Sequence, residues 1–373
     1  MNKLIFIFLM IIWSISTHKI YAYDSFDTNK LLKHWERNYK TPQDYVVDKF
    51  KTYNWVFLGE YHRIKHDVDL INSLIPLLHE KTDVRVIAIE FLNNRDTDKI
   101  NMLVTAKGFN RKDAIEILKN YAVFWPYEEY LQIFKSVWES NQKHAKTRGA
   151  IKLFGLQPYN TSTEKKDVDM SMADYFEESI LKNNFKALVY TGEHHSTIAK
   201  FKVTYDGQKN PYIRMGNYIY KTPYKSKMFF IRLHSAEDLE NSDFYMFDGK
   251  LDVLMKQFQK DIGFDVVNTP FGKITYDKPV PKTVTAYSFG QMYDGYIMFK
   301  TPIKEYVGVT CIKDDWVNNE EEYKTFWHNI PNKVAAERYR TMPFEKFKQQ
   351  WCHEPSYDYG AGFSQRFDGL PNL

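Results

Sequence analysis

The sequence predicts an α/β fold: a parallel-rich mixed sheet flanked by helices, followed by a C-terminal extension. Short β-branched and aromatic runs alternate with helical patterns between residues 54 and 200, which is typical of parallel strands joined by helices. Each predicted strand of this region is followed by polar residues that could form a site. No internal repeat or Gly/Ser-rich linker interrupts the pattern. One α/β domain carrying a C-terminal extension is therefore the simplest organisation.

The first half of the chain alternates strands and helices in order. Strands are predicted at residues 54–58, 84–89, 151–156 and 185–190. Helices are predicted at residues 65–81, 97–105, 111–120 and 172–183, and Pro126 should open a further, longer helix. The first of these helices has apolar residues at helical spacing, and Pro76 within it should produce a kink.

The second half has a looser pattern. Strands are predicted at residues 218–220, 228–233 and 295–299, and helices at residues 251–259, 320–327 and 343–351. The predicted organisation is a signal peptide at residues 1–22, an α/β domain at 23–305, and an extension at 306–373 that packs on the domain.

The N-terminus reads as an export signal. Lys3 precedes an apolar run of about ten residues, and the segment ends in a small residue, Ala22, after which we expect cleavage. That run is shorter than the roughly 20 residues that span a bilayer, and no later segment is long enough. We therefore expect an exported protein, periplasmic or secreted, with no transmembrane segment in the mature chain.

Charge and cysteine content narrow the functional classes. Cleavage removes Lys3 and Lys19 and no acidic residue, which lowers the formal charge from +4 to +2. A balance this close to neutral gives no electrostatic footprint for nucleic acid. The two cysteines, Cys311 and Cys352, can form one disulfide in an oxidising compartment or remain two thiols.

The most informative pattern is Gly-Glu-x-His, which occurs twice, each time where a buried strand should end. The copies are Gly59-Glu60-Tyr61-His62 and Gly192-Glu193-His194-His195. Ligands of open parallel sheets bind outside the carboxyl ends of the strands. A third acidic residue, Glu90, closes an apolar run in which an unpaired buried carboxylate would be costly. The glycines would let the chain turn off the sheet and let a ligand approach the backbone.

These residue types suit two hydrolytic designs. His62 and His66 are four residues apart and should share a helix face if the helix begins near Arg63. A metal site would combine imidazole and carboxylate ligands for Zn, Mn or Fe; its predicted ligands are Glu60, His62, Glu90 and His195. Without a metal, one histidine would be a general base and a carboxylate would orient it. The predicted catalytic residues are Glu60, His62, Glu90, Glu193 and His195, and the predicted cofactor-binding residues are His66 and His194.

At these motifs the chain resembles the superfamily that joins ChaN-like haem-binding proteins, erythromycin-esterase-like proteins and TraB/TIKI proteins. That family has two Gly-x-x-His motifs, each after a strand, with a strand-end Glu between them, which here corresponds to His62, His195 and Glu90. His66 is a weaker match to a second histidine of ChaN-like members, and residues 294–299 resemble the closing strand. The likeness covers residues 50–300, and its specific part covers residues 55–195.

The resemblance implies an α/β sandwich around a parallel-rich sheet, and activities that differ among branches: ester hydrolysis, metal-dependent peptide cleavage, or haem binding at a subunit interface. Our leading hypothesis is an exported hydrolase of ester or amide bonds that acts on a small-molecule or peptide substrate. The alternative is a haem- or metal-binding uptake protein, and a third is a non-catalytic interaction protein. A homodimer is one of the assemblies that the sequence leaves open.

Overall fold

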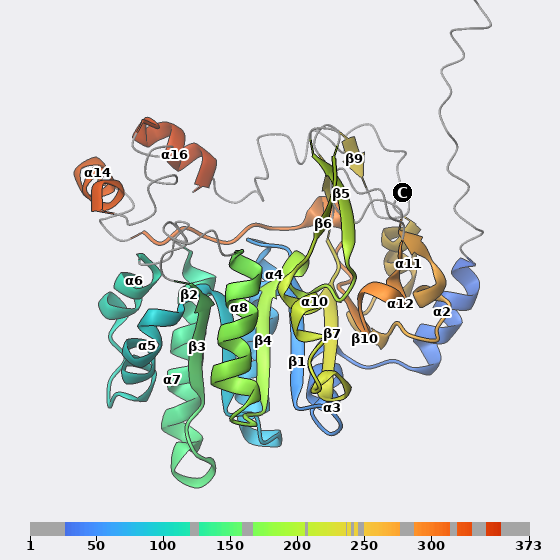
Figure 1. Ribbon diagram of the computed structural model, residues 1–373, viewed down its shortest axis with the longest axis horizontal. Helices are drawn as coiled ribbons and strands as arrows, with labels where there is room; N and C mark the ends of the chain where they lie inside the picture. The colour runs from blue at the N-terminus through green and yellow to red at the C-terminus, as the bar shows by residue number, and fades with distance from the viewer. Residues whose placement is uncertain are drawn as a thin grey trace, which may run out of the picture.

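The fold is built on a seven-stranded sheet in the order β10-β13-β7-β1-β4-β2-β3 (Figure 1). The structure is a computed structural model that describes residues 27–119, 127–158, 167–205, 208–235, 237–239, 242–244, 250–276, 287–313, 319–329 and 341–351. All neighbouring strands of this sheet are parallel except β10 and β13, which pair antiparallel. The predicted fold class is therefore confirmed.

The sheet strands are β1 (Trp55–Glu60), β2 (Val86–Asn93), β3 (Lys152–Gln157), β4 (Ala187–Gly192), β7 (Met228–Leu233), β10 (Ile262–Asp265) and β13 (Gly295–Met298). Three short antiparallel pairs lie outside it: β5 (Phe201–Tyr205) with β6 (Gln208–Tyr212), β8 (Glu237–Leu239) with β9 (Ser242–Phe244), and β11 (Thr275–Tyr276) with β12 (Tyr287–Ser288). Six of the seven sheet strands were predicted from the sequence, and β10 was not.

The described α-helices are α2 (Thr28–Arg37), α3 (Pro42–Lys49), α4 (Lys65–Lys81), α5 (Thr97–Thr105), α6 (Arg111–Lys119), α7 (Glu128–Arg148), α8 (Val168–Phe176), α9 (Glu193–Ser196), α10 (Met215–Ile219), α11 (Lys250–Phe258), α12 (Phe289–Met292), α14 (Glu320–Asn329) and α16 (Phe344–Trp351). A π-helical turn, Glu177–Leu181, continues α8, so the predicted helix at residues 172–183 is present but begins earlier. Pro76 lies inside α4, whereas Pro126 lies outside the described residues. None of the described helices combines the length and apolar composition of a membrane span.

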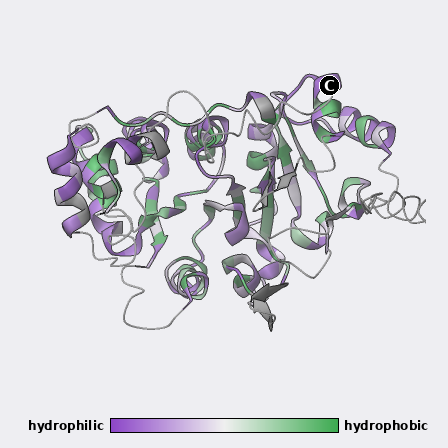
Figure 2. Ribbon diagram, turned by 90° about the horizontal axis from the view of Figure 1, so that it is seen from above, coloured by the Kyte–Doolittle hydropathy of each residue, from purple (hydrophilic) through white to green (hydrophobic). Residues whose placement is uncertain are grey.

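Alternate residues of the central strands face opposite helical layers. In β1, Val56 and Leu58 belong to the core cluster that contains residues of α4 and α7, whereas Trp55 and Phe57 belong to the cluster that contains residues of α8 and α10. This alternation follows from the two-residue period of a strand, and burial of both faces is typical of parallel sheets. Seen from above, hydrophobic residues gather along the central strands and hydrophilic ones on the outer helices (Figure 2).

The predicted strand at residues 218–220 is wrong, because α10 occupies this region. The alternation of Tyr218 and Tyr220 suggested a strand, but tertiary contacts favour a helical turn. The first backbone N–H of the helix, on Met215, donates to Asp169 Oδ1 over 2.8 Å. A Cβ atom on Gly216 would lie only 2.8 Å from the backbone of Ser196, so this helix packs closely against the residue that follows the second motif.

Residues 306–311, which we call the crossing segment, run along the edge of the sheet above α4 and α7 (Figure 1). Gly308 forms a bridge with Ile64, and Cys311 forms one with Tyr127. The Thr310 backbone N–H and hydroxyl both donate to the Glu129 carboxylate, over 2.7 and 3.1 Å. This part of the predicted extension therefore contacts the loop that follows β1. The predicted signal peptide and Cys352 lie outside the described residues, so cleavage and the disulfide remain predictions.

Candidate functional site

The register of the central strands brings the two predicted motifs side by side. Glu60, the last residue of β1, is paired with Gly192, the last residue of β4. On the other side of β1, Gly59 is paired with Arg232 of β7. Parallel strands place their carboxyl ends at one edge of the sheet, so residues more than 130 positions apart meet there. The predicted clustering of strand-end side chains is thus observed.

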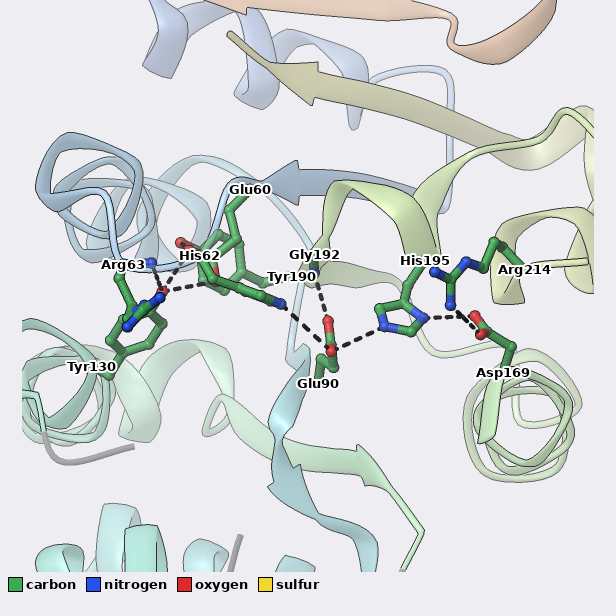
Figure 3. Close-up of polar contacts among 10 residues, drawn as sticks. All are labelled: Glu60, His62, Arg63, Glu90, Tyr130, Asp169, Tyr190, Gly192, His195 and Arg214. Atoms are coloured by element: carbon green, nitrogen blue, oxygen red, sulfur yellow. Dashed lines mark hydrogen bonds and ion pairs between the residues drawn. The ribbon is translucent and has the colours of Figure 1, made fainter. Parts of the chain in front are cut away.

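Glu60 holds His62 in place at the end of β1. His62 Nδ1 lies 2.8 Å from Glu60 Oε1, and the Tyr130 hydroxyl donates to both Glu60 oxygens over 2.8 and 2.9 Å. The Tyr190 hydroxyl donates to Oε2 as well (Figure 3). Burial and the Glu60 charge raise the pKa of both tyrosines well above the usual value, so both remain protonated donors. The carboxylate is therefore fixed by three partners.

The loop after β1 adopts a backbone conformation that side chains rarely take. Arg63 has a φ of 71°, in the left-handed region that costs non-glycine residues free energy. Two hydrogen bonds hold it there: its N–H donates to the Tyr130 hydroxyl over 3.0 Å, and its carbonyl accepts from the Val309 N–H over 3.0 Å. The residue following His62 is thus fixed by α7 and by the crossing segment.

Glu90 lies between the two motif histidines. Its Oε2 accepts the Gly192 N–H over 2.5 Å, its Oε1 lies 3.2 Å from His195 Nε2, and the same Oε1 lies 3.8 Å from His62 Nε2. Burial alone would raise the pKa of Glu90. The charges of His195 and His62 and the Gly192 N–H outweigh burial and lower that pKa, so Glu90 is ionised.

His195 is bound at both ring nitrogens. Its Nδ1 lies 2.6 Å from Asp169 Oδ1, opposite the Glu90 contact, and Arg214 Nη1 donates to Asp169 Oδ2 over 2.9 Å. Burial lowers the pKa of His195, but Glu90 and Asp169 outweigh it and raise the value to about 10. His195 is therefore an imidazolium at neutral pH. The same balance applies to His62, whose pKa is lowered by burial but raised on balance by Glu60 and Glu90.

The glycines of the two motifs are required by close approach. A Cβ atom on Gly192 would lie 2.8 Å from His62 Cε1 and Nε2, and one on Gly59 would lie 2.9 Å from the Glu193 backbone. Gly192 has a φ of −57°, which any residue can adopt. The site therefore requires glycine at these positions because a side chain would clash with neighbouring atoms, and not because the chain makes the sharp turn that we predicted.

Glu193 belongs to a separate ion pair. Its Oε2 lies 2.7 Å from Arg232 Nη2, and the Ser235 hydroxyl donates to the same oxygen over 3.4 Å. Burial raises the pKa of Glu193 despite the neighbouring Arg232 charge. This carboxylate therefore links the residue that follows β4 to Arg232 of β7.

The two predicted cofactor-binding histidines occupy different environments. The His194 side chain is 40% exposed, and burial together with Arg214 and Arg232 lowers its pKa to about 3. His66 packs between Phe299 and Tyr306, with ring centroids 4.1 and 4.3 Å away. Because α4 begins at Lys65, the predicted helix face shared by His62 and His66 is wrong. His62 remains in the preceding loop.

The predicted metal ligands meet around Glu90, but each imidazole nitrogen already faces a carboxylate. Within the described parts of the chain, no group of three or more His, Cys, Asp or Glu side chains could hold a metal ion. The arrangement seen instead is a row of alternating acids and bases: Tyr130 and Tyr190, Glu60, His62, Glu90, His195, Asp169 and Arg214 (Figure 3).

Sequence reasoning missed five members of this neighbourhood: Tyr130, Asp169, Tyr190, Arg214 and Arg232. Four of them contact a motif residue that lies at least 26 positions away in the sequence, and Arg214 contacts Asp169, which lies 45 positions away. One signal was available for Tyr190, a phenol that directly follows the aliphatic residues 187–189 of β4. Asp169 and Arg214 carry no comparable local signal.

Several known structures are similar to this chain. A succinoglycan biosynthesis protein is similar over 74% of this chain and 93% of its own, with a TM-score of 0.50 and 10% identity. An erythromycin esterase variant in its open conformation is similar over 69% and 92%, with a TM-score of 0.48 and 9% identity. ChaN of Campylobacter jejuni, described with cofacially bound haem, is similar over 53% and 88%, with a TM-score of 0.34 and 16% identity.

Comparison of the sequence with protein-family models and with curated proteins found no match. At the low identities above, the structural likeness concerns the fold alone. The α/β fold that the resemblance implied is therefore confirmed, and the roles of individual residues rest on the geometry of this site.

Proposed function

We propose that the protein is a hydrolase of ester or amide bonds in which His62 is the general base and His195 a fixed cation. The observation that carries the proposal is the placement of both imidazoles around Glu90, with His62 bound to Glu60 over 2.8 Å and His195 to Asp169 over 2.6 Å. Export, predicted from residues 1–22, is part of this proposal.

His62 has the features of a general base. The Glu60 contact places a proton on Nδ1, which leaves Nε2, 3.8 Å from Glu90 Oε1, as the atom that accepts a proton. Its side chain is 30% exposed, whereas that of Glu60 is 2% exposed. Because the pKa of His62 is raised, the base is fully available only above that value. Turnover should therefore increase with pH.

The reaction follows from these positions. His62 Nε2 removes a proton from water as the water oxygen forms a bond to the carbonyl carbon. The carbonyl oxygen becomes an oxyanion, and the His195 imidazolium stabilises the developing negative charge through its own charge alone, because both of its N–H groups stay on Glu90 and Asp169. When the bond to the leaving group breaks, the proton on His62 passes to that group. Glu90 and Asp169 stay ionised throughout and keep His195 charged.

Substitution of His62 tests this proposal. We expect His62→Gln in the chain from residue 23 to lower kcat/KM on an activated ester by at least about 100-fold, the scale of general base catalysis. His328→Gln, at an exposed position of α14, is the matched control. Both variants should unfold at the temperature of the parent protein. Parent-like turnover in a folded His62→Gln protein would contradict the role of His62.

Haem binding is a second candidate, and His194 favours it. This imidazole is 40% exposed and neutral at pH 7, because its pKa is about 3, and neutral imidazole is the form that binds haem iron. The test is a haem titration followed by absorbance. Loss of the Soret shift in His194→Ala, with retention in His66→Ala, would support this function, and no shift in the parent protein would reject it.

A further inference from the structure

We propose that the substrate carries an anionic group, a carboxylate or a phosphate, close to the bond that is cleaved. This inference deepens the proposed hydrolase function and rests on it. It follows from the exposure of the charged side chains at the strand ends, where the acidic side chains are buried and the basic ones are partly exposed.

The acidic side chains of the site are inaccessible. Glu60 is 2% exposed, Glu90 7%, Asp169 4% and Glu193 4%. Each also faces a basic partner, which offsets its negative charge. A cationic substrate group would find none of these four carboxylates within reach.

The accessible side chains are basic. Those of His62, His194, His195 and Arg214 are 30%, 40%, 18% and 16% exposed. Imidazole and guanidinium groups are the donors that bind carboxylate and phosphate oxygens most strongly. Because the donors are partly exposed and the acceptors are buried, the electrostatic potential on the solvent side of the site is positive, although the formal charges nearly balance.

His194 lies among the same basic side chains. It is the most exposed of these groups, and after burial the causes that lower its pKa are the charges of Arg214, Arg232, His195 and His62. Its nearest acid, Glu193, is 3.9 Å away and is paired with Arg232. A ligand beside His194 would therefore meet the same cationic surroundings.

The test compares two esters that differ in one charge. Mono-p-nitrophenyl glutarate and its carboxamide-capped counterpart share a leaving group and nearly share a shape. We expect at least about a tenfold higher kcat/KM for the anionic ester at low salt, and a decrease in this ratio as salt screens the interaction. Arg214→Gln should bring the ratio close to one, whereas Arg214→Lys, which keeps the charge, should retain most of it. Arg37→Gln, on the exposed end of α2, should leave it unchanged.

Binding separates failure of this inference from failure of the hydrolase function. Glutarate and glutaramide are titrated into the same proteins and followed by calorimetry, which requires no turnover. Glutarate binding that is weakened about tenfold or more by Arg214→Gln supports the inference even if neither ester is cleaved. Equal kcat/KM for the two esters at low salt, or equal affinity for glutarate and glutaramide, overturns it.

Discussion

His62 and His195 point their Nε2 atoms at the same carboxylate oxygen. The distances to Glu90 Oε1 are 3.8 Å for His62 and 3.2 Å for His195. Each ring is bound on its other side by a second acid, Glu60 or Asp169. Glu90 thus couples the two histidines electrostatically, and protonation of one changes the pKa of the other.

Neutralising Glu90 should uncouple the two histidines. In Glu90→Gln, the shape of the side chain is kept but its charge is lost, so the pKa of His195 should decrease and the orientation of His62 should loosen. We expect kcat/KM to decrease about 100-fold, measured with an activated ester, and the His195 ring protons to titrate at lower pH by NMR. Glu178→Gln, an exposed residue paired with Lys182, is the control. An unchanged pH titration of His195 would show that Glu90 does not set its charge.

Stability should depend on pH through His195. Folding raises its pKa from 6.5 to about 10. Stabilisation from the charged ring is therefore complete below pH 6.5 and is lost as pH rises toward 10. We expect the difference in the free energy of unfolding between the parent protein and His195→Gln to decrease over this range, by up to about 1.4 kcal/mol per pH unit. Urea denaturation at several pH values measures the difference. A constant difference from pH 6.5 to 10 would contradict the raised pKa.

Gly192 should be intolerant of a single methyl group. In Gly192→Ala, the new Cβ atom would lie 2.8 Å from the His62 ring and 3.3 Å from Glu90 Oε2. We expect at least about a 100-fold loss of kcat/KM, because a misplacement near 1 Å is enough for that effect, and a loss of about 1–3 kcal/mol in stability from overpacking. Gly108→Ala is the control, since a Cβ atom added at Gly108 would meet no atom within 4 Å beyond its chain neighbours. Full activity in Gly192→Ala would show that His62 can move without consequence.

The sequence predicted the strand ends but not what they contact. Periodicity placed β1, β2 and β4, and the repeated motif placed Glu60, His62 and His195, because these are local properties of the chain. Asp169, at the start of α8, contacts His195 across 26 residues, and Arg214, directly before α10, contacts Asp169 across 45 residues. No local pattern encodes these contacts.

The errors have the same physical origin. Tyr218 and Tyr220 have the alternation of a strand, but the Asp169 contact with Met215 fixes a helix start upstream of them. His66 has helical spacing from His62, yet the left-handed conformation of Arg63 separates that loop from α4. In both places a tertiary hydrogen bond overrides a local preference.

Removal of metal should leave hydrolysis unchanged. The nitrogens of His62 and His195 face Glu60, Glu90 and Asp169, and the described residues contain no group of three or more candidate ligands. We expect the same kcat/KM after dialysis against EDTA and after addition of Zn²⁺ or Mn²⁺ to the dialysed protein. Elemental analysis of the dialysed sample confirms removal. Activity that is lost with EDTA and restored by one ion would require a metal-dependent mechanism.

The crossing segment should support catalysis without touching the substrate. Thr310 donates twice to Glu129, which directly precedes Tyr130, the donor to Glu60. Val309 donates to the carbonyl of Arg63, next to His62. Both ends of the Glu60–His62 pair are therefore tied to this segment.

Removing one of these hydrogen bonds tests the role of the crossing segment. Thr310→Val removes the hydroxyl bond to Glu129 and keeps the backbone bond. We expect kcat to decrease about threefold to tenfold while KM changes little. One hydrogen bond to a charged group is worth about 1.5–3 kcal/mol, and only part of this free energy affects the position of His62. Val307→Ala, at a 46% exposed position of the same segment, is the control. A positioning role also predicts an altered pH–rate profile, because His62 loses part of its contact with Glu60. A change in unfolding temperature without a change in that profile would reduce Thr310 to a structural residue.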